Sequence, residues 1–265
     1  MRCLYREKRY HCGNYLDVEV YPVFSYQKRR GAKKNPTSET QKKLNQKRAE
    51  LSAIRTINAN FTGKDFEIEL TYTDETRPAT LDDALRDRAN FIRRLKRLYR
   101  KWGIRVIKLF LVTEEAPRYH HHIVVTGCDD RDALEALWQY GYANSKRLRF
   151  NENGVEGLAR YITKESHRGD KNAFRRRFSV SRNMEKPKES KRDGRISARK
   201  AEELATYDAM TRREWEKLYP GYVFVKSEPL FNEVNGEYYI LARLYKAGTK
   251  FGITEGGGKR RVKKT

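Results

Sequence analysis

The chain has 265 residues, enough for one sizeable domain or two small ones, and its 38% hydrophobic content with 17 tyrosines and 11 phenylalanines argues against wholesale disorder. Lysine and arginine number 58 against 35 aspartates and glutamates, and the net charge of +23 favours nucleic acid as a partner over a membrane surface. No apolar run is long enough to cross a membrane, and three unevenly spaced cysteines do not suit a disulfide framework, so we expect a cytoplasmic protein.

The N-terminal part is predicted to hold one strand and one helix. Residues 15–22 alternate between apolar and polar, which indicates a peripheral strand, and the basic run 27–34 indicates a mobile arm. A helix is predicted over residues 38–58, with Ser38 as its cap. Four apolar residues lie at roughly helical spacing within it: Leu44, Leu51, Ile54 and Ile57.

The middle of the chain shows the clearest periodicity. Residues 66–72 alternate with period two, which predicts a half-buried strand. A basic amphipathic helix is predicted over 80–101 and ends at Gly103. Residues 104–113 and 119–126 are predicted strands, and the short turn between them makes them an antiparallel hairpin.

The next elements alternate again between helix and strand. We expect a helix over 129–139, a short strand over 146–150 and a helix over 153–165. This order predicts an α+β fold with one central antiparallel sheet and helices mainly on one face.

The last third is polar and basic. Residues 166–200 have no clear period, a helix is expected at about 198–218, and residues 222–228 and 237–245 should form a hairpin around a turn at Asn235 and Gly236. The tail 256–264 is predicted to be disordered. The expected regions are an N-terminal arm and helix (1–60), a central domain (61–185) and a basic C-terminal region (186–265).

Three adjacent histidines carry the strongest chemical signal. In a strand, His120 and His122 point to one face while His121 points to the other, so the outer pair can chelate a divalent cation. A one-residue shift in register would bring in His121 instead. The preceding strand ends close to His120, and Glu114 is the preferred third ligand because it shares a face with Val112; Glu115 is the alternative.

The second signal is Tyr161 with Lys164 on the helix that follows. Residues i and i+3 share a helix face, so the two side chains are presented together. A tyrosine hydroxyl is protonated at neutral pH and becomes a useful nucleophile when a cation stabilises its oxyanion or the attacked phosphate.

These motifs resemble those of the HUH endonucleases (His–hydrophobic–His), specifically the replication initiators of rolling-circle plasmids and phages. The resemblance covers roughly residues 60–185: a strand ending at Tyr72, then Glu114 followed by the histidines, then Tyr161 with Lys164. It implies an HUH-type palm, Mg²⁺ or Mn²⁺ held by Glu114, His120 and His122, Tyr161 as the nucleophile that becomes joined to the 5′ end of the DNA, and Lys164 as its cationic helper.

The resemblance also implies partners: single-stranded DNA or an origin hairpin, and a host polymerase and helicase in the bacterial cytoplasm. The sequence departs from the family at His121, which replaces an apolar residue, and at Glu165, where some initiators carry a second tyrosine. A water activated by Glu165, or the tyrosine of a second protomer, would then complete termination. The alternatives are a mobilisation relaxase, a single-tyrosine transposase and a non-catalytic nucleic-acid-binding protein.

Overall fold

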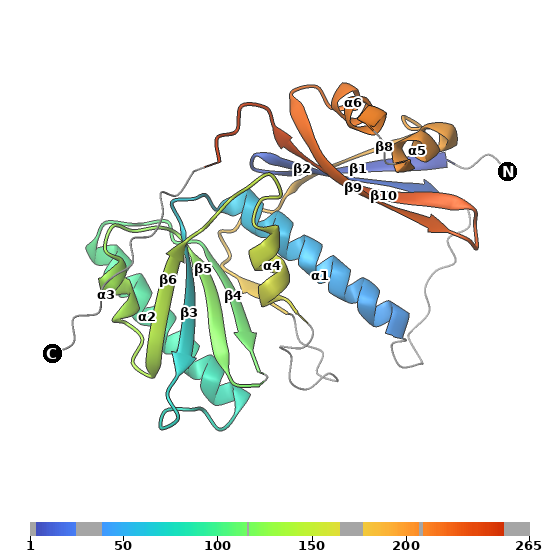
Figure 1. Cartoon of the computed structure of the whole chain (residues 1–265). Helices are drawn as coiled ribbons and strands as arrows, with labels where there is room; N and C mark the ends of the chain where they lie inside the picture. The colour runs from blue at the N-terminus through green and yellow to red at the C-terminus, as the bar shows by residue number, and fades with distance from the viewer. Residues whose placement is uncertain (1–3, 25–38, 116, 165–176, 207–208, 252–265) are drawn as a thin grey trace.

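The computed structural model describes residues 4–24, 39–115, 117–164, 177–206 and 209–251. Within these ranges the chain is α+β, with six helices and ten strands arranged as two antiparallel five-stranded sheets (Figure 1). The single central sheet expected from the sequence is therefore accompanied by a second one. The basic run 27–34, Ser38, Glu165 and the tail 256–264 lie outside the described residues.

One sheet carries the three histidines and is called here the histidine sheet. Its strand order is β6-β3-β5-β4-β7, and its strands are β3 (Phe66–Tyr72), β4 (Leu109–Glu114), β5 (His120–Val125), β6 (Gly141–Arg147) and β7 (Ser179–Val180). The predictions of a strand over 66–72 and of an antiparallel hairpin formed by β4 and β5 are confirmed.

Helices cover both faces of the histidine sheet, which corrects the expectation of helices mainly on one face. Helix α2 (Leu81–Lys101) covers the face of Ile68 and Ile123. Helices α1 (Glu39–Asn60) and α4 (Glu156–Ile162) cover the opposite face, where Phe110 and Val124 are buried. The reason is that β4 and β5 carry apolar residues at both odd and even positions, so both faces exclude water.

The expected helix over 80–101 is confirmed as α2, with its ends defined by local chemistry. The Thr80 hydroxyl accepts a hydrogen bond from the Asp83 amide at the N-terminus. Gly103, with φ of 74°, follows the C-terminus in the left-handed conformation that a side chain would disfavour.

Several boundaries differ from the sequence expectation. The helix expected over 153–165 is α4, which spans only 156–162. Residues 104–108 precede β4 as irregular chain, and the apolar Ile104 and Ile107 there pack onto the core beneath α2. Helix α3 (Arg131–Glu135) is shorter than 129–139, although Asp130 caps it. Strand β6 spans 141–147 rather than 146–150. The sequence did not indicate these bounds, because β6 is an edge strand whose exposed residues show no apolar alternation.

The second sheet is built from the two ends of the chain and is called here the terminal sheet. Its order is β8-β1-β2-β10-β9, and its strands are β1 (Leu4–Cys12), β2 (Tyr15–Val23), β8 (Lys188–Asp193), β9 (Tyr222–Asn232) and β10 (Glu237–Lys246). The C-terminal hairpin is confirmed. Strand β2, expected to be peripheral, is instead the central strand, and segments that the sequence assigned to separate regions share this sheet.

Two short helices cover one face of the terminal sheet. Helices α5 (Ala198–Ala205) and α6 (Ala209–Leu218) replace the single helix expected at 198–218. They bury a core around Trp215. None of the helices in the described ranges is long and apolar enough to span a membrane.

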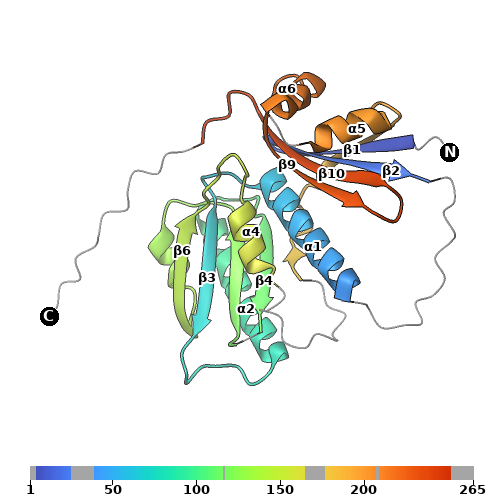
Figure 2. The ribbon, with the colours of Figure 1, turned by 45° about the vertical axis from the view of Figure 1, so that its right-hand side comes forward.

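Helix α1 lies between the two sheets, as both views of the ribbon show (Figures 1 and 2). Ile54 and Ile57 pack against the histidine sheet. Arg55 points the other way and pairs with Asp17 of β2, with 2.9 Å between Nε and Oδ2. The helix therefore joins one sheet through apolar contact and the other through buried charge.

Candidate metal centre and tyrosine

Strand β5 places His120 and His122 on the face covered by α4, with their ring centroids 5.3 Å apart. The antiparallel register sets Glu69 of β3 opposite His122 and Glu114 of β4 opposite His120. Because neighbouring residues in register share a face, the two imidazoles and two carboxylates are brought to one place by backbone pairing alone.

His121 lies on the other face and is fully buried. Its ring nitrogens are hydrogen-bonded to the Thr113 hydroxyl (2.9 Å) and the Tyr72 hydroxyl (3.0 Å). Burial, followed by the nearby Arg88 guanidinium, lowers the pKa of His121 to about 3, so its ring is neutral at physiological pH. This histidine is part of the core beneath α2, and the shifted register that would make it a ligand is not the one adopted.

Glu114 bridges the two remaining histidines. Its Oε2 lies 2.8 Å from His120 Nε2, and its Oε1 lies 3.0 Å from His122 Nε2. Glu69 also lies near the two histidines. One carboxylate oxygen of Glu69, one ring nitrogen of His120 and one of His122 lie within 4.8 Å of one another. These residues could hold a metal ion, and two imidazoles with carboxylates suit a divalent transition metal or Mg²⁺.

Further contacts orient both imidazoles toward the cluster. His120 Nδ1 donates to the Arg118 carbonyl oxygen at 3.0 Å, which leaves Nε2 directed at Glu114. His122 Nδ1 lies 3.5 Å from Glu67 Oε1. Both ring nitrogens of His122 are buried and, within the described residues, make no hydrogen bond of regular geometry. A cation bound to Nε2 would satisfy this atom, so the residues present fit a metal site.

The protonation of the cluster follows from its charges. Burial opposes ionisation of Glu114, but the two imidazoles outweigh it and lower the pKa of Glu114 to about 2. Burial likewise opposes protonation of His122, yet Glu114 and Glu67 raise its pKa to about 9. The pKa of His120 is also raised, by Glu114 against burial. A cation that binds this cluster at neutral pH would therefore have to displace the proton that the carboxylates favour on His122.

Tyr161 of α4 reaches the edge of this cluster. Its ring meets that of His122 edge-to-face, with 5.6 Å between centroids, and its side chain remains 44% exposed. Lys164 Nζ lies 5.2 Å from the centre of the Tyr161 ring. Burial, followed by the charges of Glu114 and Glu69, raises the pKa of Tyr161. Positive charge at the cluster would act in the opposite direction and favour the oxyanion.

The structure therefore brings together all five residues selected from the sequence: Glu114, His120, His122, Tyr161 and Lys164. It adds Glu69 and Glu67, which the sequence analysis passed over. The available signal was their position in β3, where they alternate with Phe66 and Ile68 and so face away from the α2 core. Glu115, the alternative ligand, follows the end of β4 and lines a pocket of about 220 Å³ beside Glu114 and Lys164.

Comparison of the chain with protein-family models, with curated proteins and with solved structures gave no match.

The arrangement of the cluster predicts which single carboxylates contribute to Mn²⁺ affinity. We expect Glu114→Gln and Glu69→Gln each to weaken Mn²⁺ binding about 10- to 100-fold, because each removes a charged oxygen beside both imidazoles. Glu115→Gln should leave Mn²⁺ affinity within about twofold. Isothermal titration calorimetry measures all three variants, and equal losses in Glu115→Gln and Glu114→Gln would refute the assigned set.

The raised pKa of His122 predicts that Mn²⁺ affinity increases with pH. Without metal, the ion pair between protonated His122 and Glu114 stabilises the folded protein. This stabilisation is fully present below about pH 6.5, the pKa of histidine in the unfolded chain. It is lost as pH rises through about 9, the pKa of His122 in the folded protein. Metal must displace that proton, so affinity should rise about tenfold per pH unit between pH 7 and 8.5 for each proton released. Calorimetry in buffers of different ionisation enthalpy counts the protons. A pH-independent affinity without proton release would contradict this.

Proposed function

We propose that the protein is a rolling-circle replication initiator of the HUH endonuclease type, which cleaves single-stranded DNA in a metal-dependent reaction and becomes covalently joined to it. The observation that carries this proposal is the edge-to-face contact between the ring of Tyr161 and that of His122. A half-exposed tyrosine beside two histidines and two carboxylates combines a nucleophile with a site for a phosphate-polarising cation.

The arrangement of the histidine sheet supports an HUH-type palm. The two histidines lie on the central strand β5, and the tyrosine comes from the helix that follows β6 and packs over the same face. The tyrosine follows the histidines in the chain, which favours an initiator over those mobilisation relaxases in which it precedes them. A single-tyrosine transposase has the same order and is the second candidate.

The reaction transfers a phosphoryl group from a 3′ oxygen of the DNA strand to Tyr161. The Tyr161 oxygen forms a bond to phosphorus as the bond from phosphorus to the 3′ oxygen breaks; the tyrosine hydroxyl loses its proton and the departing 3′ oxygen gains one. Glu69, Glu114, His120 and His122 would hold Mg²⁺ or Mn²⁺, which supplies positive charge to the attacked phosphate. Lys164 adds positive charge on the tyrosine side. The 3′-OH released is the primer for a host polymerase, which a host helicase would assist.

An open part of the histidine sheet supports single-stranded DNA as the substrate. On the face of the metal cluster, β6 carries Tyr142, Asn144 and Lys146, paired in register with the side of β3 that bears Glu67 and Glu69. Tyr142 is 73% exposed, and Asn144 and Lys146 are also exposed. An exposed aromatic ring stacks on any unpaired base, while an amide and an ammonium group bind the backbone.

Replacement of Tyr161 tests the reaction. We expect Tyr161→Phe to abolish the covalent adduct, because phenylalanine keeps the ring packing on His122 but has no oxygen to attack phosphorus. Protein and Mn²⁺ are incubated with labelled single-stranded oligonucleotides that cover the intergenic DNA beside the gene encoding the protein. The products are separated on a denaturing gel. Tyr142→Phe is the matched control and should still form the adduct. A metal-dependent adduct formed by Tyr161→Phe, or binding without cleavage by the wild type with any metal, would contradict the proposal.

Replacement of Tyr142 tests the binding surface. Loss of one base–aromatic stack costs about 1–3 kcal/mol, so Tyr142→Ala should weaken binding of single-stranded DNA about 5- to 150-fold. Mn²⁺ affinity should be unchanged, and Tyr142→Phe should restore DNA binding. Leu230→Ala removes a comparably exposed apolar side chain, 63% exposed on the terminal sheet, and serves as the control. Fluorescence anisotropy measures the affinities, and equal losses in Tyr142→Ala and Leu230→Ala would exclude β6 as the specific surface.

A further inference from the structure

Helix α4, which presents Tyr161, has little intrinsic means of holding its own position. It is seven residues long, and its N-cap residue, Val155, makes no side-chain capping hydrogen bond. Isolated helices of this length are unstable in water, because nucleation costs more than a few hydrogen bonds return. The placement of Tyr161 must therefore come from contacts that α4 makes with the rest of the protein.

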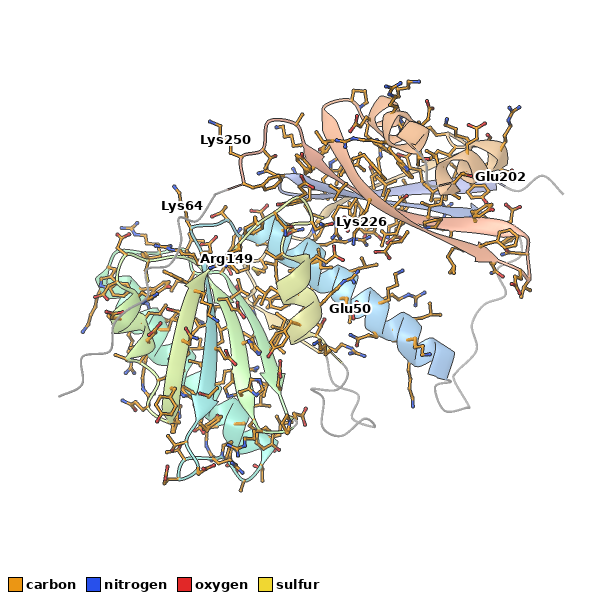
Figure 3. All side chains as sticks on the ribbon, in the orientation of Figure 1. Glu50, Lys64, Arg149, Glu202, Lys226 and Lys250 are labelled. Atoms are coloured by element: carbon orange, nitrogen blue, oxygen red, sulfur yellow. The ribbon has the colours of Figure 1, made fainter. Side chains whose placement is uncertain are left out.

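The first residue of α4 is tied to the terminal sheet by buried charge. Glu156 is 8% exposed, and its Oε2 accepts a hydrogen bond from Arg243 Nη1 of β10 at 2.8 Å. Its Oε1 accepts from Lys226 Nζ of β9 at 2.7 Å. Lys226 is labelled in Figure 3, where side chains fill the space between α4 and the terminal sheet. Arg243 Nη1 also donates to the carbonyl oxygen of Asn153, just before the helix, at 3.2 Å.

Arg243 is itself held in place by Asp17 of β2. It is 3% exposed and contacts both carboxylate oxygens of Asp17 on β2, with distances of 2.8 Å from Nε and 3.2 Å from Nη2. Asp17, 2% exposed, also accepts from Arg55 Nε of α1. Such paired, charge-assisted hydrogen bonds fix direction as well as distance, because the planar guanidinium matches each carboxylate in one orientation.

The same end of α4 is held against α1. The Val155 amide donates to Asn58 Oδ1 at 3.1 Å. Gly154 packs so closely against Asn58 that a Cβ at this position would lie 2.4 Å from the amide nitrogen of its side chain. Tyr15 of β2 adds a hydrogen bond to the Asn151 carbonyl oxygen at 2.8 Å. The N-terminal end of α4 is therefore located by both the terminal sheet and α1.

We infer that Arg243, acting through Glu156, is a positioning residue for Tyr161: the terminal sheet orients the nucleophile helix over the metal cluster, although it contributes no group to that cluster. This inference rests on the proposed function of Tyr161. Buried ion pairs add little net stability compared with apolar packing, since desolvation of the charges offsets their attraction. The network instead fixes the orientation of α4, which non-directional apolar contacts would not do.

The test separates positioning from stability. Glu156→Ala keeps a good helix former and leaves Arg243 paired with Asp17, and Arg243→Met is the complementary change. The control is Arg195→Gln, which removes an ion pair with the buried Glu7 inside the terminal sheet and does not reach α4. Single-turnover rates of adduct formation and Mn²⁺ affinity are measured for each variant at a temperature where all are folded.

We expect Glu156→Ala and Arg243→Met to slow adduct formation about 10- to 100-fold, because misplacement of a nucleophile by about 1 Å has an effect of this size. Their Mn²⁺ affinity should stay within about twofold of wild type, and Arg195→Gln should form the adduct at the wild-type rate. An unchanged rate in Glu156→Ala, or an equal loss in Arg195→Gln, would overturn the inference.

A second readout does not depend on cleavage. With 3-fluorotyrosine at position 161 and no metal added, the ¹⁹F chemical shift should differ from that of a solvent-exposed fluorotyrosine in the wild type and in Arg195→Gln, because the ring contacts His122. The shift should move toward the solvent-exposed value in Glu156→Ala as the ring leaves His122. If the wild type never forms an adduct but this change is seen, the proposed function fails and the positioning of Tyr161 stands. If the shift is the same in all variants, the network does not position the ring.

Discussion

Strand β5 is paired on both sides, with β3 along one edge and β4 along the other, and this position decides what each of its histidines can do. Alternation sends His121 into the core beneath α2, where two hydroxyl groups satisfy it as a neutral ring. The same alternation sends His120 and His122 to the opposite face, among carboxylates from both neighbouring strands. Three adjacent residues of one type thus lie in two different environments because a strand has two faces.

The charges around the candidate site suit a bound cation. The protein as a whole carries a net charge of +23, yet Glu67, Glu69 and Glu114 gather around His122. Carboxylates would repel a phosphate at short range, whereas the positive charge of the whole chain would attract the proposed DNA substrate from a distance. A divalent cation bound by these residues would remove the conflict, because it would neutralise the carboxylates where the proposed mechanism places the phosphate.

Several features are determined by the sequence itself. The strand over 66–72, helix α2 and the β4–β5 hairpin follow from apolar periodicity, because a half-buried strand repeats every two residues and an amphipathic helix about every 3.6. The pairing of His120 with His122 needs only the knowledge that they lie in a strand. The preference for Glu114 over Glu115 likewise follows from strand parity, and the distances agree with it.

Other features depend on partners that are distant in the chain. Glu69 joins the cluster only because β3 pairs with β5, about fifty residues later, and nothing near Glu69 in the sequence indicates that neighbour. Strand β1 was not predicted, because its residues do not alternate between apolar and polar. Its charged side chains instead form ion pairs with the neighbouring strand β8, Arg6 with Asp193 and Lys8 with Glu189. The sequence determined which side chains share a face of each regular element. Only the tertiary structure decided which elements meet, because pairing and burial depend on groups that local periodicity does not specify.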